Sequence, residues 1–356
     1  MKAVSRALAL CLSLAAAPAL AGNLFPAKSG DSDAPTVRVY SSLDEVIARP
    51  LIESFQATNP ELAVDYEELQ TLEIYERIIR ETDSSGVTAD IAFSSAMDLQ
   101  VKLVNDGYAA QVSLPGARFL PDWAQWRSAA YGVTFEPAVV VYHKPSFAET
   151  APPKTRAELI ELLRAQGDRF FGRVGTYDIE RAGLGFFFLA RDEAHYRDIW
   201  DLVRALGASG VKLYSSSAAI LERVADGRFA LGYNILGSYA ESWAANNPDL
   251  GIVLPADYTV IMSRIGLVPE AARSPDLGIA FLDHLISLEG QVVLARDVRL
   301  PALHPDIDGR FTAASLRREH GDRLRPVPIG PGLVVYLDQV KRERLIERWN
   351  EALRSQ

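Results

Sequence analysis

Hydroxyl-bearing residues recur where expected strands end and expected helices begin. Ser41 and Ser42 close a β-rich run that starts at Thr36, and Ser94 and Ser95 close another that starts at Ala89. In open α/β sheets, ligands bind beyond the carboxyl ends of the strands. Free N–H groups at helix starts, with hydroxyls beside them, favour phosphate or carboxylate groups. These serines could therefore hold an anion.

The same pattern recurs further along the chain. Three more junctions of this kind are Thr176-Tyr177, Ser215-Ser216-Ser217 and Gly237-Ser238. Serine is also a common helix cap, so each junction alone predicts only a cap. Together, in two separate blocks of the chain, they predict a cleft. Arg181 follows Thr176-Tyr177 in a loop. It either binds an anion through two parallel hydrogen bonds (bidentate binding) or is an exposed loop arginine.

The sequence contains no recognisable catalytic or metal-binding motif. The five histidines are scattered without ligand spacing, and the sequence has no H-E-x-x-H, P-loop, G-x-S-x-G or G-x-G-x-x-G motif. We therefore expect no catalytic residue, no metal site and no cofactor. A periplasmic enzyme remains as a competing hypothesis, but it would need a nucleophile and base that the sequence does not offer.

The first 21 residues have the pattern of a cleavable signal peptide. Lys2 and Arg6 form a basic start, an apolar stretch runs from Ala7 to Ala17, and Ala19-Leu20-Ala21 supplies the small-x-small cleavage pattern. The apolar stretch is too short to span a bilayer, which needs about 20 residues. We expect a periplasmic protein. Cleavage would remove Cys11, the only cysteine, so no disulfide is expected.

The charge and the pattern of elements limit the function and fold further. The net charge of −9 makes nucleic acid and anionic membrane surfaces poor partners. Residues 22–35 read as a linker, and β-rich and helical segments alternate after Thr36. This alternation predicts an α/β fold with parallel sheets covered by helices. Two long extended segments, 130–144 and 258–269, divide the chain and predict two α/β lobes joined by crossing strands.

Several segments resemble periplasmic solute-binding proteins of ABC importers (extracellular solute-binding family 1), in the class related to ferric-ion-binding proteins. They are 39–44 (VYSSLD), 89–99 (ADIAFSSAMDL), 131–133 (YGV), 232–239 (GYNILGSY) and 278–290. The resemblance implies a type II periplasmic-binding-protein fold, whose two lobes close on ligand by a hinge. On this basis we expect lobe 1 to comprise residues 36–133 and 261–300, and lobe 2 residues 134–260 and 301–356.

The resemblance also indicates where the ligand binds. Ser41 and Ser42 match the family's first ligand loop, Ser94 and Ser95 its second, and Asn234 to Tyr239 its second-lobe loop. With the strand-end residues, the expected ligand-binding set is Ser41, Ser42, Ser94, Ser95, Thr176, Tyr177, Arg181, Asn234, Gly237, Ser238 and Tyr239. The iron binders carry two adjacent tyrosines in the last loop, whereas this sequence has only Tyr239 there.

The single tyrosine and the serines make the chain most similar to the binding component of phosphoglycerate transport and regulation systems. The resemblance thus implies a small anionic solute, with a phosphorylated organic compound expected and ferric ion as the alternative. It implies an inner-membrane ABC permease or a sensor histidine kinase as partner. We expect a monomer.

Overall fold

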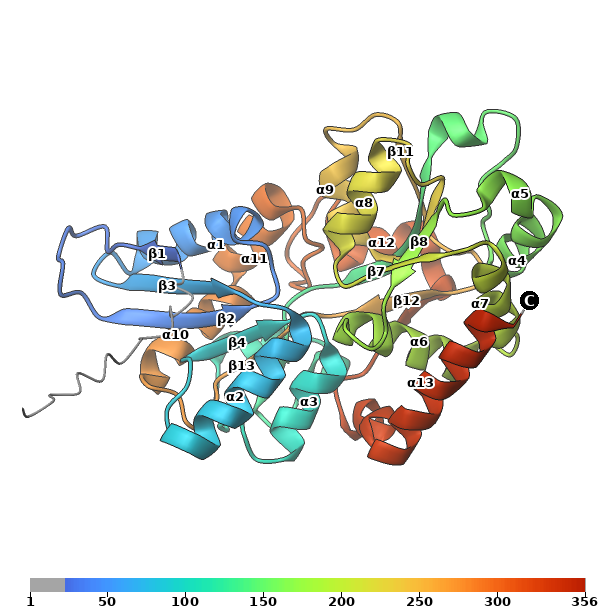
Figure 1. Cartoon of the computed structure of the whole chain (residues 1–356). Coiled ribbons are helices and arrows are strands. Elements are labelled where there is room, and N and C mark those ends of the chain that lie inside the picture. Colours follow the sequence, from blue (N-terminus) through green and yellow to red (C-terminus); the bar gives the residue numbers. More distant parts are fainter. Residues whose placement is uncertain (1–22, 356) are drawn as a thin grey trace, which may run out of the picture.

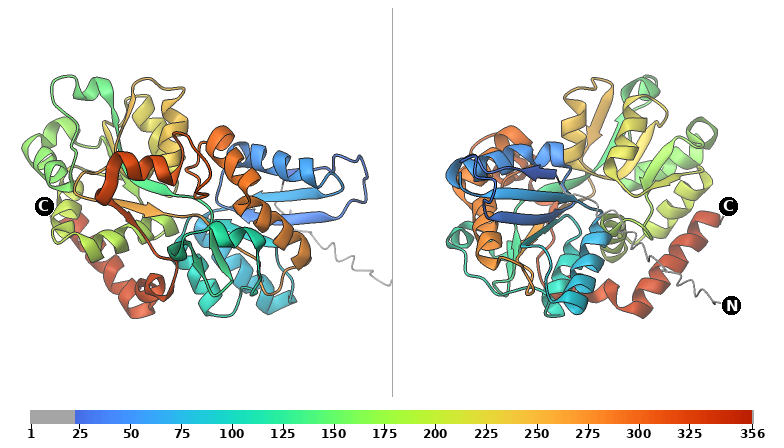
Figure 2. Two further views of the ribbon diagram at one scale, coloured as in Figure 1. Left: turned by 180° about the vertical axis from the view of Figure 1, so that it is seen from behind. Right: turned by 60° about the vertical axis from the view of Figure 1, so that its left-hand side comes forward.

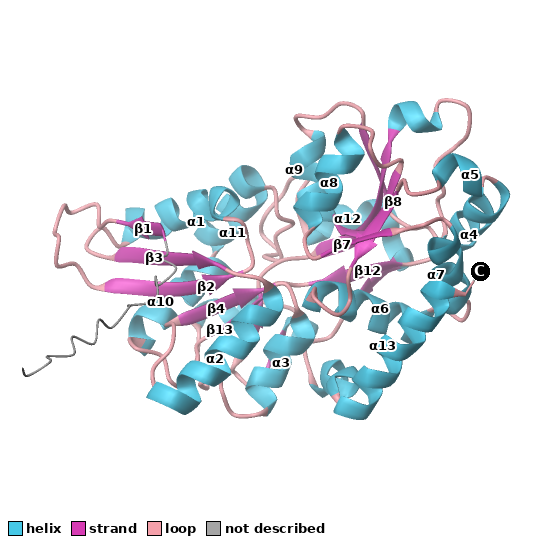
Figure 3. Cartoon of the chain, in the orientation of Figure 1, coloured by secondary structure: helices cyan, strands magenta, loops and turns pink. Residues whose placement is uncertain are grey.

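Two sheets, each flanked by helices, form the two lobes of the protein. The computed structural model describes residues 23–355, so the predicted signal peptide and Cys11 lie outside the described residues. Figures 1 and 3 show the two groups of strands lying end to end, with helices on their outer faces. The predicted α/β fold with two lobes is confirmed.

The first lobe is built around a mixed sheet. In spatial order its strands are β1 (Asn23–Phe25), β3 (Ala63–Glu68), β2 (Thr36–Ser41), β4 (Ile91–Ser94), β13 (Ile265–Leu267), β6 (Ala130–Gly132) and β5 (Gln125–Trp126). β2 runs parallel to β3 and β4, whereas β13 is antiparallel to β4 and β6. Its helices are α1 (Glu45–Thr58), α2 (Thr71–Ser85), α3 (Met97–Asn105), α10 (Pro275–Ile286) and α11 (Leu288–Val293).

The second lobe is built around another mixed sheet. Its order is β14 (Leu324–Pro326), β12 (Thr259–Met262), β7 (Glu136–His143), β10 (Leu231–Leu236), β8 (Val174–Tyr177) and β9 (Lys212–Tyr214), and β11 (Leu250–Val253) also pairs with β7. Its helices are α4 (Arg156–Ala165), α5 (Gly167–Phe170), α6 (Gly183–His195), α7 (Ile199–Ala208), α8 (Ser217–Ala225), α9 (Gly237–Ala244), α12 (Ala313–His320) and α13 (Gln339–Arg354). β7 is antiparallel to β10, β11 and β12, so the expectation of purely parallel sheets is wrong.

Short helical turns complete the described part of the chain. They are η1 (Pro115–Phe119), η2 (Asp122–Ala124), η3 (Lys144–Phe147), η4 (Leu294–Val298), η5 (Gly321–Arg323) and η6 (Pro331–Leu337). No single described helix is long and apolar enough to cross a membrane, although the bent pair Pro275–Ile286 and Leu288–Val298 would pass by length and composition.

The chain crosses between the sheets more than once. It passes from β6 to β7 through residues 133–135, and from β12 to β13 through Ser263 and Arg264. A third segment of the chain, at Pro301, lies beside the first crossing. There the Phe135 amide donates to the Pro301 carbonyl at 2.8 Å. Figure 2 shows these thin connections between the lobes from two further sides. The lobe limits stay a prediction, with β12 extending to Met262, beyond the expected limit at residue 260.

The expected linker is partly wrong. Asn23–Phe25 form β1, which pairs antiparallel with β3, and the Phe25 side chain is buried. The Gln56 side-chain amide donates to the carbonyls of Phe25 and Pro26 at 3.2 and 3.0 Å. This segment is therefore tied to the edge of the first sheet by hydrogen bonds and by burial of Phe25.

Candidate functional site

A pocket of about 500 Å³ lies between the two sheets, where strands of both lobes end. It is lined by Ser42, Asp44, Glu68, Leu69, Gln70, Thr71, Ser95, Tyr177, Leu184, Ser215, Ser216, Ser217, Ala218 and Tyr239. The first lobe supplies its share from the loops that follow β2, β3 and β4. The second lobe supplies its share from the segments that follow β8, β9 and β10.

The lining combines hydroxyl groups, helix starts and two carboxylates. The helices α1, α2, α8 and α9 all begin at or beside the pocket, and the first N–H groups of a helix have no partner within it. Such helix starts attract negative charge. Asp44 and Glu68 have the opposite effect and can accept hydrogen bonds from hydroxyl groups. The pocket therefore suits a molecule with both acceptor and donor groups.

Ser42 and Ser95 form a linked pair on the first-lobe wall. The Ser95 amide donates to Ser42 Oγ at 3.0 Å, and the two hydroxyl oxygens lie 3.3 Å apart. Their neighbours Ser41 and Ser94 are buried and do not line the pocket. Instead, Ser41 Oγ accepts from the Leu43 amide at 3.1 Å and stabilises the turn after β2.

Tyr177 and Ser217 form a matching pair on the second-lobe wall. Their hydroxyl oxygens are 2.5 Å apart. Burial raises the pKa of Tyr177 to about 12, so its phenol stays protonated at neutral pH. Ser216 caps α8, where its hydroxyl accepts from the Ala219 amide at 3.3 Å. The junction at 215–217 thus contributes both a cap and pocket hydroxyls.

Tyr239 connects the lobes across the pocket. Its hydroxyl donates to Asp44 Oδ1 at 2.5 Å and accepts from the Asp44 amide at 3.2 Å. Burial raises the pKa of Tyr239 well above its usual value, and the negative charge of Asp44 adds to the shift. In this arrangement the phenol proton points to Asp44. Within residues 23–355, no group of three or more His, Cys, Asp or Glu side chains could hold a metal ion.

The remaining predicted site residues lie outside this pocket. Thr176 donates to the Tyr233 carbonyl at 3.1 Å, and the Asn234 side chain donates to the buried Asp192 at 2.7 Å. Both side chains are buried within the second lobe. Thr176 points away from Tyr177 because successive residues of a strand point to opposite faces, whereas Asn234 lies at a β-bulge of β10 with a φ of 59°. Arg181 is exposed and absent from the lining.

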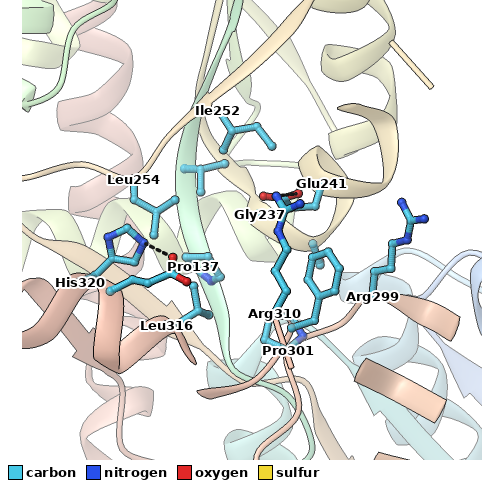
Figure 4. Close-up of a pocket in the computed structure, with 14 residues that line it drawn as sticks. Pro137, Gly237, Glu241, Ile252, Leu254, Arg299, Pro301, Arg310, Leu316 and His320 are labelled. Carbon is cyan, nitrogen blue, oxygen red and sulfur yellow. Dashed lines mark hydrogen bonds and ion pairs between the residues drawn. The ribbon is translucent and has the colours of Figure 1, made fainter. Parts of the chain in front are cut away.

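Gly237 and Ser238 face a different pocket, on the far side of the α9 start (Figure 4). It encloses about 570 Å³, with apolar walls that include Ile252, Leu254 and Leu316. Two of its charged groups are engaged with each other, since Arg310 pairs with Glu241 at 2.9 Å. Ser42, Ser95 and the other residues of the loops after β2, β3 and β4 do not line it. The pocket between the sheets is therefore the better candidate for a ligand site.

Sequence reasoning missed Arg264, which lies in the crossing between β12 and β13. Its side chain is fully buried, and its Nε donates to Glu136 Oε1 at 3.0 Å. Its Nη1 lies 3.5 Å from Ser42 Oγ, and its Nη2 has no hydrogen-bond partner. Asp44, Glu68, Gln70 and Thr71 were also missed, although each ends or follows a strand, the signal that singled out the serines.

Comparison with known proteins identifies the class. Residues 51–306 match the sequence profile of the bacterial extracellular solute-binding proteins, so the chain belongs to this family. It is a solute-binding protein and not an enzyme, and the family places it outside the cytoplasm. A search of curated proteins finds no match.

Solved structures agree with this assignment. The substrate-binding protein of an ABC transporter from Agrobacterium tumefaciens is 60% identical, with a TM-score of 0.91, covering 95% of this chain and 100% of that one. AfuA from Actinobacillus pleuropneumoniae, with fructose-6-phosphate bound, is 15% identical, with a TM-score of 0.75 and 91% and 100% coverage. Iron-bound HitA from Pseudomonas aeruginosa is 15% identical, with a TM-score of 0.70 and 89% and 99% coverage. The last two show the shared fold alone.

Proposed function

We propose that this protein captures a small hydroxylated organic anion, such as a phosphate ester, in the pocket between its lobes. It then delivers the solute to the inner-membrane permease of an ABC importer, after export by the predicted signal peptide. The Agrobacterium relative, which works in an ABC transporter, supports the transport role.

The main support for an anionic ligand is the pairing of Ser42 with Ser95 beside several helix starts. Ser42 Oγ already accepts from the Ser95 amide, which favours the use of its proton as a donor. Donors and helix starts on one wall suit a phosphate or carboxylate group. The same fold holds fructose-6-phosphate in AfuA, so it can accommodate a ligand of this size.

The carboxylates argue for an organic body attached to the anion. Asp44 and Glu68 would repel a bare inorganic anion, but they can accept hydrogen bonds from sugar-like hydroxyl groups. Glu68 already accepts from the Glu45 amide at 2.9 Å, which leaves acceptor capacity on its other oxygen. A molecule with an anionic end and hydroxyl groups would pair with both the hydrogen-bond donors and the carboxylates of the pocket.

Thermal unfolding tests this function directly. Wild-type protein is scanned with inorganic phosphate, fructose-6-phosphate, 3-phosphoglycerate and uncharged fructose. We expect the phosphate esters to raise the Tm, because a ligand selective for the folded state stabilises it, and inorganic phosphate to raise it less. A Tm that responds to none of these anions, or only to fructose, would contradict the proposal.

Two further measurements address the partner and the native ligand. Uptake into membrane vesicles that carry the permease distinguishes import from presentation to a sensor histidine kinase. A native mass spectrum of the purified protein would show a co-purified solute by its mass, and it would also test the expected monomer.

A further inference from the structure

Arg264 is a buried cation with unused donors beside the pocket. Its side chain is completely buried, yet only Nε makes a short bond to a carboxylate, Glu136 Oε1. Of the other two nitrogens, Nη1 reaches Ser42 Oγ at 3.5 Å and Nη2 has no partner. A buried polar group without a partner is costly, so such a group calls for an explanation.

Glu136 holds the guanidinium but cannot satisfy it. Glu136 Oε1 also accepts from Thr134 Oγ1 at 2.7 Å, and Oε2 accepts from the Ser238 hydroxyl. Both carboxylate oxygens are therefore already engaged by hydroxyl groups. Burial lowers the pKa of Arg264, but the attraction of Glu136 and of Asp44 outweighs it, so the pKa is raised and the group stays charged.

The contact with Ser42 has a consequence for the direction of hydrogen bonding. A hydroxyl oxygen has two acceptor sites and one proton. Ser42 Oγ accepts from the Ser95 amide and from Arg264 Nη1, so its proton must be donated. It goes either into the pocket or to Ser95 Oγ, 3.3 Å away, which would free the Ser95 proton for the pocket. In both cases the pair presents a donor.

We propose that Arg264 is a positioning residue of the solute site, which fixes the Ser42–Ser95 pair as donors and so makes the pocket prefer an anionic group over a neutral one. This inference rests on the proposed function, because it assumes that the solute carries an anion. Arg264 lies in the segment between β12 and β13 that crosses between the lobes, and it contacts Ser42 of the first lobe. The low dielectric of the buried site strengthens its effect.

The test compares charged and neutral probes by isothermal titration calorimetry. Fructose-6-phosphate and fructose form one pair, and 3-phosphoglycerate and glycerol form another. The double variant Arg264→Met with Glu136→Met removes the ion pair without leaving a buried charge, which is often tolerated. We expect its affinity for the phosphorylated probes to fall about tenfold or more, since hydrogen bonds to charged groups are worth that much, while fructose binding stays the same.

The single variant Arg264→Lys, alone and combined with Ser42→Ala, sharpens the test. Arg264→Lys keeps the charge beside Glu136 but loses the forked donors, so we expect an intermediate affinity for the phosphorylated probes. In a Ser42→Ala background, Arg264→Lys should have little further effect on those probes, because coupled residues are not additive. Full additivity of the two changes would overturn the assignment of Arg264 as acting through Ser42.

A matched control separates this role from general stability. The double variant Arg156→Met with Asp192→Met removes another buried ion pair, whose atoms lie 3.0 Å apart in the second lobe and outside the pocket. We expect it to keep the wild-type ratio of affinities for charged and neutral probes. Circular dichroism checks the folding of every variant.

The outcomes separate the two proposals. If wild type prefers the phosphorylated probes and the Arg264 variants keep that preference, only the role of Arg264 is overturned. The same holds if the variants lose charged and neutral probes by equal factors. If wild type binds none of the anionic probes, the proposed function fails and the inference fails with it.

Discussion

Tyr239 of the second lobe donates a hydrogen bond of 2.5 Å to Asp44 of the first lobe, so the two lobes touch directly across the pocket. The same hydroxyl accepts from the Asp44 amide. Both residues line the pocket. A solute that enters the pocket therefore finds the two lobes already joined by the Tyr239–Asp44 hydrogen bond.

Tyr239→Phe should favour opening of the lobes. The change removes a hydrogen bond to a carboxylate, worth on the order of 1 to 3 kcal/mol, and leaves the aromatic packing in place. We expect a larger radius of gyration by small-angle X-ray scattering without ligand. Tyr66→Phe is the control, because the Tyr66 hydroxyl bonds the Leu43 carbonyl within the first lobe at 2.6 Å. Identical scattering from Tyr239→Phe and wild type would contradict a latch between the lobes.

Ser95→Ala should weaken solute binding by about tenfold, since it removes a donor to an anionic group. The measurement is calorimetric titration with the phosphate ester that most raises the Tm. Ser209→Ala is a matched control, because Ser209 is also buried but bonds the Leu206 carbonyl at 2.7 Å, outside the pocket. Equal affinities for Ser95→Ala and Ser209→Ala would remove Ser95 from the site.

Asp98→Asn should make stability less dependent on pH. Burial raises the pKa of Asp98 to about 7, although Arg191 and Arg342 oppose the shift. Because the folded state binds this proton more tightly than the unfolded state, Asp98 lowers stability as the pH rises from about 4 to 7. We expect Asp98→Asn to be similar in stability to wild type near pH 4, and to exceed wild type by a larger margin at pH 8 than at pH 5.

Urea denaturation at pH 5 and pH 8 measures this difference. Asp83→Asn, at an exposed position of α2, is the control and should follow wild type at both pH values. A wild-type-like pH dependence of Asp98→Asn would show that Asp98 ionises normally in the folded protein.

Asp192→Ala should destabilise the second lobe by roughly 3 to 5 kcal/mol, because it leaves Arg156 buried with a partner removed. Asp192 also accepts from Tyr233, Asn234 and Tyr258 at 2.6 to 2.7 Å. The free energy of unfolding in urea measures the loss. Asp201→Ala removes an exposed ion pair with Arg204 and should change stability by less than about 1 kcal/mol. A similar small change for Asp192→Ala would contradict the importance of this cluster.

The alternation of strands and helices was enough to predict two α/β lobes, because it follows from local sequence patterns. The position of β13 between β4 and β6 was not predictable in this way. Its pairing with β4 joins residues far apart in the chain, such as Ile265 and Ser94. β1 was missed because three residues are too few to show an alternating pattern.

The site was predicted in part for a geometric reason. Neighbouring residues at a strand end point to opposite sides, so only Ser42 of the first serine pair and Ser95 of the second line the pocket. Tyr177 and Tyr239 also line it, whereas Thr176 does not. Arg264 could not be predicted, since its partners Glu136 and Ser42 lie far away in sequence.

The insertion of β13 into the first sheet separates the order of synthesis from the order of folding. β2, β3 and β4 leave the ribosome early, but the strand that joins β4 to β6 comes only at Ile265–Leu267. Until then the first lobe has an open edge in the middle of its sheet. A nascent chain of this design cannot complete its first sheet until most of it has been translated, which would suit the export of an unfolded chain that the predicted signal peptide implies.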